Sequence, residues 1–295
     1  MGKNFIALGF MSGTSGDGVD SSIISSNGED YINIKYNRFD PYPMDLSKKI
    51  HKLRENILEI QDLLKYSVDI KKLEIEITNF HADIAIQISK RFEFEIIGFH
   101  GHTIYHNSDQ KISKQIGLGN ILSKTTNKTV VYDFRQNDLK NGGQGAPLTP
   151  IFHNTLANKL NEKFNLKFPI NILNIGGISN ITCTVDWEDS ECKNKILAYD
   201  IGPGNCLIDE WIRKNSKKKY DKDGFLASSG KTDKLIFNQA LENFTENFSY
   251  KKSLDVNDFD IFFAKGLSLE NGAATITDFT AKLIADGMNY AHGKD

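Results

Sequence analysis

The pattern of apolar and polar residues predicts a chain in which strands alternate with helices. Strands are expected where short apolar or alternating runs are bounded by turn-forming residues. These runs cover Phe5–Phe10, Val19–Ser25, Tyr31–Phe39, Glu95–Phe99, Thr129–Phe134, Ile170–Ile175, Ser179–Val185 and Lys195–Asp200. Helices are expected over Leu46–Leu64, Leu73–Phe92, Asn120–Asn127, Phe152–Phe164, Asn205–Lys214, Asp233–Phe244 and Ala274–Tyr290. Such alternation indicates an α/β protein whose sheets are covered by helices.

The connections between these elements suggest a division of the chain into two parts. A length of 295 residues gives a prior of two domains at about 150 residues each. A boundary near Asn127–Asp133 would separate a first domain, 1–128, led by a hairpin, from a second α/β domain, 129–295. The polar, Gly-rich stretch Arg135–Thr149 is expected to be a loop, and so is the charged stretch Lys214–Asp223.

Composition and charge exclude several classes of function. With 36 basic and 38 acidic side chains the net charge is −2, which argues against a nucleic-acid binder that relies on a global basic field. No apolar run approaches the ~18 residues of a membrane span, so no membrane partner is expected. The three cysteines, Cys183, Cys192 and Cys206, form no C-x-x-C motif, which disfavours a disulfide framework and a cysteine zinc site. A reducing, cytoplasmic setting is the expectation.

The first candidate site is the polar turn between the first two predicted strands. Its glycines permit a tight turn with exposed N–H groups, and its hydroxyls add donors, an arrangement that suits phosphate oxygens. Two of its acids, Asp17 and Asp20, could hold Mg²⁺. An ordinary hairpin turn has the same composition and stays an equal alternative. The candidate nucleotide-binding residues here are Gly13, Thr14, Ser15, Gly16, Asp17, Gly18, Val19 and Asp20.

Two further candidates lie in the second half of the chain. Gly176 and Gly177 form a second Gly-bearing hairpin, which would also suit a polyphosphate unless it is an unrelated turn. Asp200 ends a predicted strand and is followed by Gly-Pro-Gly and a helix N-terminus, whose free N–H groups attract anions. A carboxylate there is a reasonable general base, although a turn or capping Asp is the simpler interpretation.

Two sequences in the first half suggest contacts to a polar substrate. Arg135 follows a predicted strand, is backed by acids, and could grip a carboxylate through its guanidinium. The segment His100-Gly-His-Thr103 favours a turn that contacts a sugar, with hydrogen bonds from His102 and Thr103. A metal site is disfavoured there, because the histidine spacing suits no single face and no acid lies within the segment.

Together these segments resemble one family, the anhydro-N-acetylmuramic acid kinases of bacterial cell-wall recycling, in the sugar kinase, Hsp70 and actin superfamily. The resemblance extends in order over most of the chain and is highly specific. It rests on Gly9–Asp20, Gly98–Thr103, Asp133–Arg135, Gly142–Leu148, Asn174–Asn180 and Asp200–Asn205.

The resemblance implies a two-domain, ribonuclease H-like fold with a central cleft that binds ATP and Mg²⁺. Asp200 would be the base that activates water, so that the 1,6-anhydro ring opens and O6 is phosphorylated to N-acetylmuramate 6-phosphate. The phosphates would contact the first loop and Gly176–Gly177. The sugar would contact His102, Thr103, Arg135, Gly202 and Asn205. A homodimer is left open.

The resemblance also implies that the chain is shortened at its C-terminus, where the family has an adenosine-binding sub-lobe. An apolar face of the last helix, with Ile276, Phe279, Leu283 and Ile284, would then be exposed and would promote self-association. Two alternatives to the kinase follow: a catalytically inactive remnant, or a sugar- or phosphate-binding protein without turnover.

Overall fold

The computed structural model describes residues 3–13, 15–186, 196–250 and 253–291, and divides into two compact units. The first unit is Met1–Leu148 and the second is Thr149–Asp295. Sequence patterns place the division earlier, after residue 128. The later division follows from strand pairing, because β6 (Thr129–Tyr132) lies parallel to β4 (Ile96–Asn107) in the first sheet. Both units are α/β, as expected.

The first unit is built on a six-stranded mixed sheet with the order β3-β2-β1-β4-β5, in which β6 also pairs with β4. β1 and β2 form the expected antiparallel hairpin, and β1 runs parallel to β4. The strands not yet given are β1 (Phe5–Ser12), β2 (Gly18–Ser26), β3 (Ile32–Pro41) and β5 (Ile112–Ile116).

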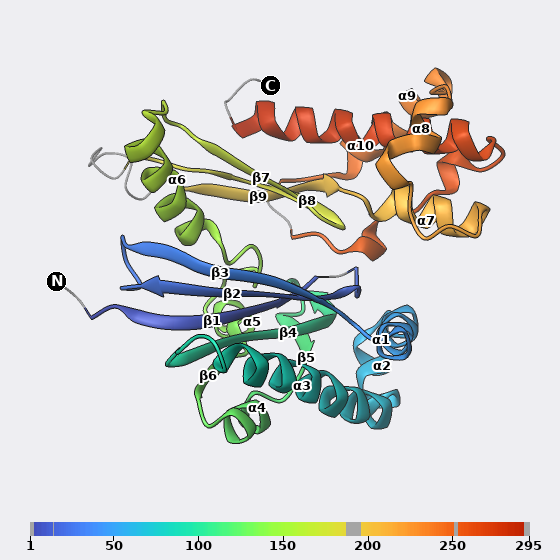
Figure 1. Ribbon diagram of the computed structural model, residues 1–295. Helices are drawn as coiled ribbons and strands as arrows, with labels where there is room; N and C mark the ends of the chain where they lie inside the picture. The colour runs from blue at the N-terminus through green and yellow to red at the C-terminus, as the bar shows by residue number, and fades with distance from the viewer. Residues whose placement is uncertain (1–2, 14, 187–195, 251–252, 292–295) are drawn as a thin grey trace. The chain divides into compact units, whose positions relative to one another are not determined.

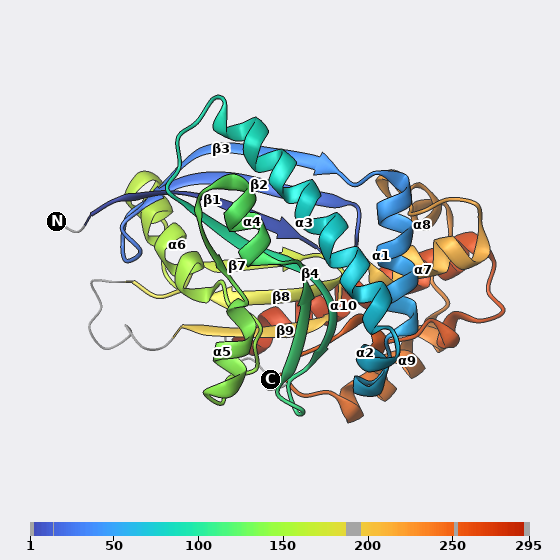
Figure 2. The same cartoon turned by 90° about the horizontal axis from the view of Figure 1, so that it is seen from below.

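Helices cover a face of this sheet, and α3 and α4 lie side by side on it in Figure 2. The long helix α3 buries Leu73, Ile77, Ile84 and Ile88, at the three- and four-residue spacing of one helical face. His81 belongs to the same face and packs edge-on against Phe10, Phe80 and Phe99. The helices of this unit are α1 (Met44–Asn56), α2 (Ile60–Lys65), α3 (Ser67–Ser89), α4 (Gly119–Thr126) and α5 (Phe134–Lys140).

The single helix expected over Leu46–Leu64 is wrong, since α1 and α2 are separate. The backbone is extended at Ile57, and a new helix starts after Glu59. The Asp62 carboxylate accepts hydrogen bonds from the backbone N–H groups of Leu58 and Glu59, at 3.0 Å each. These bonds lower the pKa of Asp62. The capping box satisfies the N–H groups at the helix start, which an apolar periodicity does not reveal.

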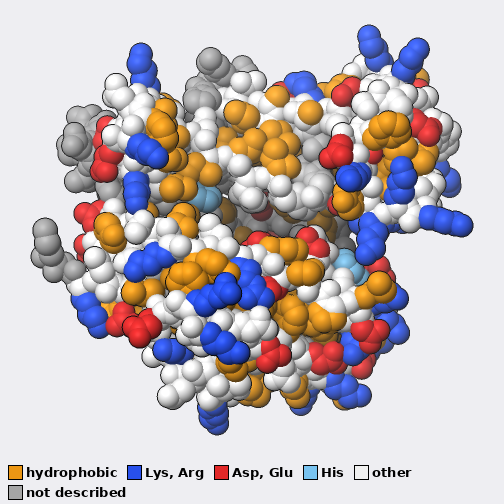
Figure 3. Space-filling model, in the orientation of Figure 1, with side chains coloured by type: hydrophobic (Ala, Val, Ile, Leu, Met, Phe, Trp, Pro, Cys, Tyr) orange, Lys and Arg blue, Asp and Glu red, His pale blue; other side chains and the backbone are white. Residues whose placement is uncertain are grey.

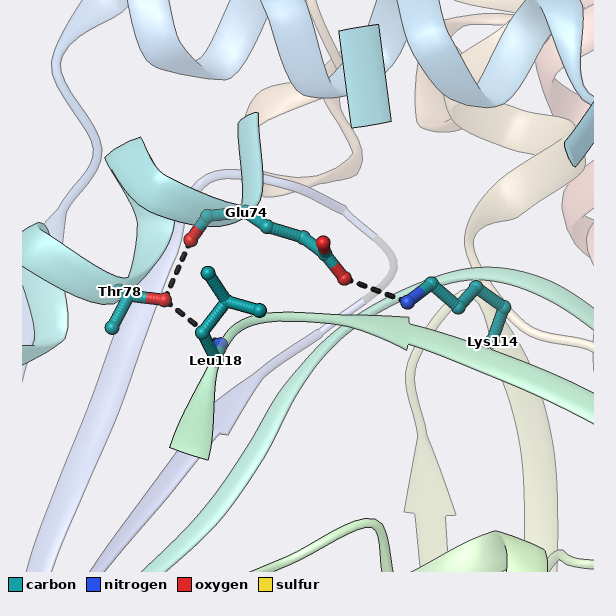
Figure 4. Close-up of polar contacts among 4 residues, drawn as sticks. All are labelled: Glu74, Thr78, Lys114 and Leu118. Atoms are coloured by element: carbon teal, nitrogen blue, oxygen red, sulfur yellow. Dashed lines mark hydrogen bonds and ion pairs between the residues drawn. The ribbon is translucent and has the colours of Figure 1, made fainter. Parts of the chain in front are cut away.

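A second difference concerns the strand expected to end at Phe99. β4 continues to Asn107 and pairs with β5, so that His100–Thr103 lies in a strand rather than in a turn. The hairpin is tied to α3 by the contacts in Figure 4. Lys114 donates to the buried Glu74 carboxylate at 2.6 Å, and the Thr78 hydroxyl accepts from the Leu118 N–H at 2.9 Å.

The stretch Arg135–Thr149 is not wholly a loop, because its residues 135–140 belong to helix α5. The helix begins one residue before Arg135 and ends at Lys140. The remainder, including the Gly run, is irregular. The polar composition that predicts a loop is compatible with one short helix on the surface, where no apolar periodicity is needed.

The second unit contains the three-stranded antiparallel sheet β7-β8-β9. In Figure 1, α10 runs along this sheet, and α6 lies on its other side. The side chains agree. Ile181 belongs to a cluster against which Ile284 and Met288 of α10 pack, whereas the next residue, Thr182, contacts His153 of α6. The elements are α6 (Pro150–Phe164), β7 (Asn171–Ile175), β8 (Ile178–Cys183), β9 (Leu197–Pro203), α7 (Cys206–Asn215), η1 (Lys222–Gly224), α8 (Phe225–Ser229), α9 (Lys234–Asn247), η2 (Val256–Asp258), η3 (Phe262–Ala264) and α10 (Leu269–Ala291).

The expectation of an exposed apolar face on the last helix is wrong. Ile276, Phe279 and Leu283 are at most 4% exposed and belong to the core of the second unit, with Leu207 and Trp211 of α7. Ile284, also on α10, packs against the sheet cluster that contains Ile181 and Ile201. The chain therefore supplies its own cover for this face, and the argument for self-association through it fails.

The surface carries both signs of charge. Figure 3 shows basic and acidic side chains interspersed on the visible face, in keeping with the small net charge. Among the helices that the structure describes, none is both long and apolar enough to cross a membrane.

Candidate functional site

The predicted phosphate loop connects β1 to β2 in the first unit. The Gly16 N–H donates to the Gly13 carbonyl at 3.1 Å, which closes a tight turn, and the Ser15 hydroxyl donates to Asp17 at 2.7 Å. The loop is braced from α1, because the Ser47 hydroxyl donates to the Gly16 carbonyl at 2.8 Å. Thr14 lies outside the described residues. The turn is thus held from two sides.

The glycines of this loop have different reasons to be glycine. At Gly18 a Cβ would lie 2.4 Å from the Asp40 carbonyl oxygen and 2.7 Å from the Phe39 ring, so that no side chain fits. At Gly13 the nearest atom to a Cβ is the Ser15 hydroxyl, at 3.7 Å, an ordinary contact. The protein itself therefore requires glycine at 18 but not at 13.

Asp17 and Asp20 lie close enough to affect each other. Burial raises the pKa of Asp20, and the negative charge of Asp17 raises it further. Two neighbouring carboxylates fit Mg²⁺, which is commonly bound by one or two carboxylates together with substrate phosphates. Within the described part of the chain no group of three or more His, Cys, Asp or Glu side chains could hold a metal ion. Any magnesium at this loop would need oxygen ligands from the substrate or water.

Behind the loop, the end of β1 carries a buried chain of hydrogen bonds. The Tyr42 hydroxyl donates to the Ser12 hydroxyl at 2.9 Å, and Ser12 lies 2.9 Å from Nδ1 of His102. Since Ser12 accepts from Tyr42, its own proton is available for Nδ1, and the His102 proton is then on Nε2. Burial, together with the nearby Arg54, lowers the pKa of His102 to about 3, so the ring is neutral. Its Nε2 has no hydrogen-bond partner among the described residues.

The neighbouring His100 fixes Arg135. Arg135 donates from Nε to Nε2 of His100 at 3.0 Å and from Nη1 to the Gly145 carbonyl at 2.9 Å. Because an arginine nitrogen only donates, the His100 proton must be on Nδ1, which lies 2.9 Å from the Gly101 carbonyl. Asp138, one of the nearby acids, accepts a hydrogen bond from the Gly145 N–H at 2.7 Å. Gly145 is thus held through its carbonyl by Arg135 and through its N–H by Asp138, which keeps the Gly-rich loop beside the guanidinium.

In the second unit, the two Gly-bearing segments form one joint. The N–H groups of Gly204 and Asn205 donate to the carbonyls of Gly177 and Gly176, respectively, each at 2.8 Å. A Cβ on Gly204 would lie 2.1 Å from the Gly176 oxygen. These two residues precede α7, and the N–H of Cys206, its first residue, also donates to the Gly177 carbonyl at 3.4 Å. The N–H groups at this end are therefore not all free, as they were expected to be. Asn205 itself is exposed, while Gly202 is buried towards Leu283.

Asp200 lies within β9, not at its end as predicted, and is 7% exposed. Asn180 pairs with Asp200 and Ser179 with Gly202, so Ile201 is an extra residue directly after the acid. Such irregularities are frequent next to active sites, because they redirect a side chain. The Asp200 Oδ2 atom accepts hydrogen bonds from the Leu254 N–H at 2.9 Å and the Ser253 hydroxyl at 3.3 Å.

The predicted site residues are thus divided between the two units. The phosphate loop, His102, Thr103 and Arg135 belong to the first unit, and Gly176, Gly177, Asp200, Gly202 and Asn205 to the second. Thr103 accepts from the Gln115 amide at 3.2 Å.

Sequence reasoning gave no positioning role to Ser12, Tyr42, His100 or Ser253, although Ser12 and His100 lie inside motifs that it singled out. All four act through partners distant in sequence, for which a single sequence carries no signal.

The comparison with family models decides the affiliation. The model described as "Anhydro-N-acetylmuramic acid kinase" matches residues 5–294. The chain belongs to the anhydro-N-acetylmuramic acid kinase family. Three relatives with this name illustrate the similarity within the family. The protein of Pelagibacter ubique (strain HTCC1062) is 47% identical over 287 residues, covering 96% of this chain and 74% of the relative.

The other two relatives are more distant but are matched over a similar extent. The protein of Brucella canis is 35% identical, covering 96% of this chain and 75% of its own. The protein of Rhizobium johnstonii is 34% identical, covering 94% and 74%. The chain therefore spans about three quarters of the length of these kinases.

Proposed function

We propose that this chain uses ATP to phosphorylate 1,6-anhydro-N-acetylmuramic acid while water opens the anhydro ring, giving N-acetylmuramate 6-phosphate. The family affiliation supports a kinase, and the observation that carries the reaction type is the buried, hydrogen-bonded Asp200 carboxylate. The substrate has no free O6 hydroxyl, so a base must act on water rather than on the sugar. A buried carboxylate held in place by hydrogen bonds suits that task.

In the proposed reaction, Asp200 removes a proton from water as the water oxygen attacks C1. The C1–O6 bond breaks, O6 attacks the γ-phosphorus, and ADP leaves. Phosphoryl transfer mainly needs in-line positioning and charge neutralisation. For those roles we assign the phosphate contacts to the loop 13–20 and to Gly176–Gly177. Mg²⁺, when bound through Asp17 and Asp20, supplies neutralisation of phosphate charge.

The sugar contacts are assigned to Thr103, Arg135 and Asn205, with Gly202 lining the same segment of β9. Arg135 is held in place by His100 and Gly145, which fixes the plane of the guanidinium before substrate binds. His102 has no exposed surface, so its contribution is to support the loop through Ser12 rather than to touch the sugar. A preorganised donor loses less freedom on binding than a mobile one.

We also propose a cytoplasmic location and a homodimer. The described cysteines, Cys183 and Cys206, are free thiols, which fits a reducing compartment. β3 is at the edge of the first sheet and exposes Ile34 and Phe39 by about half, a surface that a second copy would cover. Sedimentation velocity of the pure chain and of Ile34→Lys tests the dimer: a wild-type monomer rejects it.

A product analysis tests the function. ADP release, organic phosphate and a new reducing end should appear in equal amounts, and only when the anhydro sugar is present. Asp200→Asn should lower turnover by about 10²–10⁴-fold, the usual contribution of a general base. Asp286→Asn, which removes a charge from a surface pair on α10, is the control and should keep full activity. ADP release without a reducing end would reject the hydrolytic part of the reaction.

A further inference from the structure

The segment that follows α9 reaches back to the proposed base. Ser253 and Leu254 are more than 50 residues from Asp200 in sequence, yet both donate to its Oδ2 atom. Ser253 is 8% exposed and Asp200 7% exposed, so water competes little for these bonds. Hydrogen bonds to an ionised carboxylate are stronger than neutral ones and are directional. They fix the rotation of the carboxyl group as well as its charge.

The same segment is anchored by aromatic rings beside Asp200. Tyr250 packs on Tyr199, the residue before Asp200, with ring centroids 5.1 Å apart. It also stacks on Tyr290 of α10 at 4.4 Å, and Phe248 lies edge-on to it at 4.9 Å. The Tyr199 hydroxyl donates to the Gly287 carbonyl at 2.6 Å, which ties the strand to α10. Aromatic pairs in these geometries attract each other beyond the effect of the area that they bury.

These contacts tie Phe248, Tyr250, Ser253 and Leu254 to the strand and to the last helix. The extra residue Ile201, directly after Asp200, interrupts the regular strand pairing at this point. We infer that Ser253 and the Leu254 N–H are positioning groups for Asp200: they hold Oδ2 and so orient the carboxylate towards the water that it deprotonates. This role rests on the proposed function, because it assumes that Asp200 is the base.

A positioning role for Ser253 differs from a merely structural role in its effect on kcat and KM. Ser253→Ala should lower kcat about tenfold and leave KM for the sugar and for ATP unchanged, since no substrate contact is lost. Ser253→Thr keeps the hydroxyl and should restore kcat to within about threefold. Ser228→Ala, the same change at an exposed hydroxyl of the second unit, is the control and should match the wild type.

A double-mutant cycle with Asp200→Asn gives the sharper test. If Ser253 acts through Asp200, Ser253→Ala should cost less than about twofold once the carboxylate is gone. A full tenfold loss in that background, a change in KM alone, or an unchanged kcat in the single variant would each overturn the inference.

The amide of Leu254 provides a readout that does not depend on turnover. Its hydrogen exchange should be slow in the wild type and at least tenfold faster in Asp200→Ala, because its acceptor is removed. Unchanged exchange would reject the positioning role whatever the kinetics. A wild-type chain that has a protected Leu254 amide but no sugar-dependent turnover would instead reject the proposed function, and with it the role of Asp200 as a base. The two failures are therefore distinguishable.

Discussion

The contrast between Gly13 and Gly18 predicts that two substitutions in one loop affect different properties. Gly13→Ala places a Cβ 3.7 Å from its nearest neighbour, so the free energy of unfolding should change by less than ~0.5 kcal/mol. Gly18→Ala places a Cβ 2.4 Å from the Asp40 carbonyl oxygen, a backbone atom that cannot move cheaply. Overpacking of this kind costs about 1–3 kcal/mol.

For ATP binding, the informative substitution is Gly13→Ala, because it should leave stability unchanged. If the loop cradles phosphate through N–H groups, the methyl group at residue 13 shields them and removes about one charge-assisted hydrogen bond. Such a bond contributes ~1.5 kcal/mol or more, which corresponds to about tenfold in affinity. Gly13→Ala should therefore bind ATP at least tenfold more weakly while unfolding like the wild type.

Two measurements on the same preparations decide the matter. Urea denaturation gives the stability of each variant, and isothermal titration calorimetry gives its affinity for ATP. Gly18→Ala should show a lower urea midpoint, whereas Gly13→Ala should show weaker binding only. Wild-type affinity in Gly13→Ala would refute the phosphate-binding role of this loop, and wild-type stability in Gly18→Ala would refute the steric argument.

Further predictions concern stability and pH. Thr78→Val, a change at a fully buried residue, leaves the Leu118 N–H without its acceptor and should cost about 1–3 kcal/mol, seen as a lower urea midpoint. The native pKa values of His81 and His100 are lowered to about 4, chiefly by burial, from an ordinary value of 6.5. Between these values the unfolded chain binds protons that the folded chain does not, so stability should fall as the pH drops from 7 to 5, by about 2 kcal/mol for each ring. Urea midpoints at both pH values test this, and His81→Phe should reduce the dependence; an equal midpoint at pH 5 and pH 7 would contradict it.

The elements that the sequence predicted correctly are those with a local signal. The hairpin of β1 and β2, the helix after Asn205 and the strands around Gly176–Gly177 follow from alternation and turn residues. The break between α1 and α2 required a capping box, in which Asp62 competes with continued helix. The strand pairing of His102 with Ile116 required a partner that its own pattern does not specify. Tertiary contacts decided these cases.

The site shows the same division. Ordered motifs pointed to the phosphate loop, to Arg135 and to Asp200, whereas the groups that orient them come from elsewhere in the chain. His100 fixes Arg135 from the neighbouring strand, and Ser253 reaches Asp200 from a segment without any recognisable motif. Orientation depends on three-dimensional proximity, which a single sequence does not encode in any short pattern.

The joint between the two Gly-bearing segments has a consequence for how this unit tolerates change in length. The joint consists of main-chain hydrogen bonds at one end of the sheet, between Gly176–Gly177 and Gly204–Asn205. The link from β8 to β9 leaves from the opposite end, where Cys183 pairs with Leu197. Insertions in that link leave the joint intact, whereas one added residue between Pro203 and Cys206 shifts every donor by one position. The link from β8 to β9 is therefore the place for a tag or a spectroscopic label. Natural variation in length should concentrate in the same link.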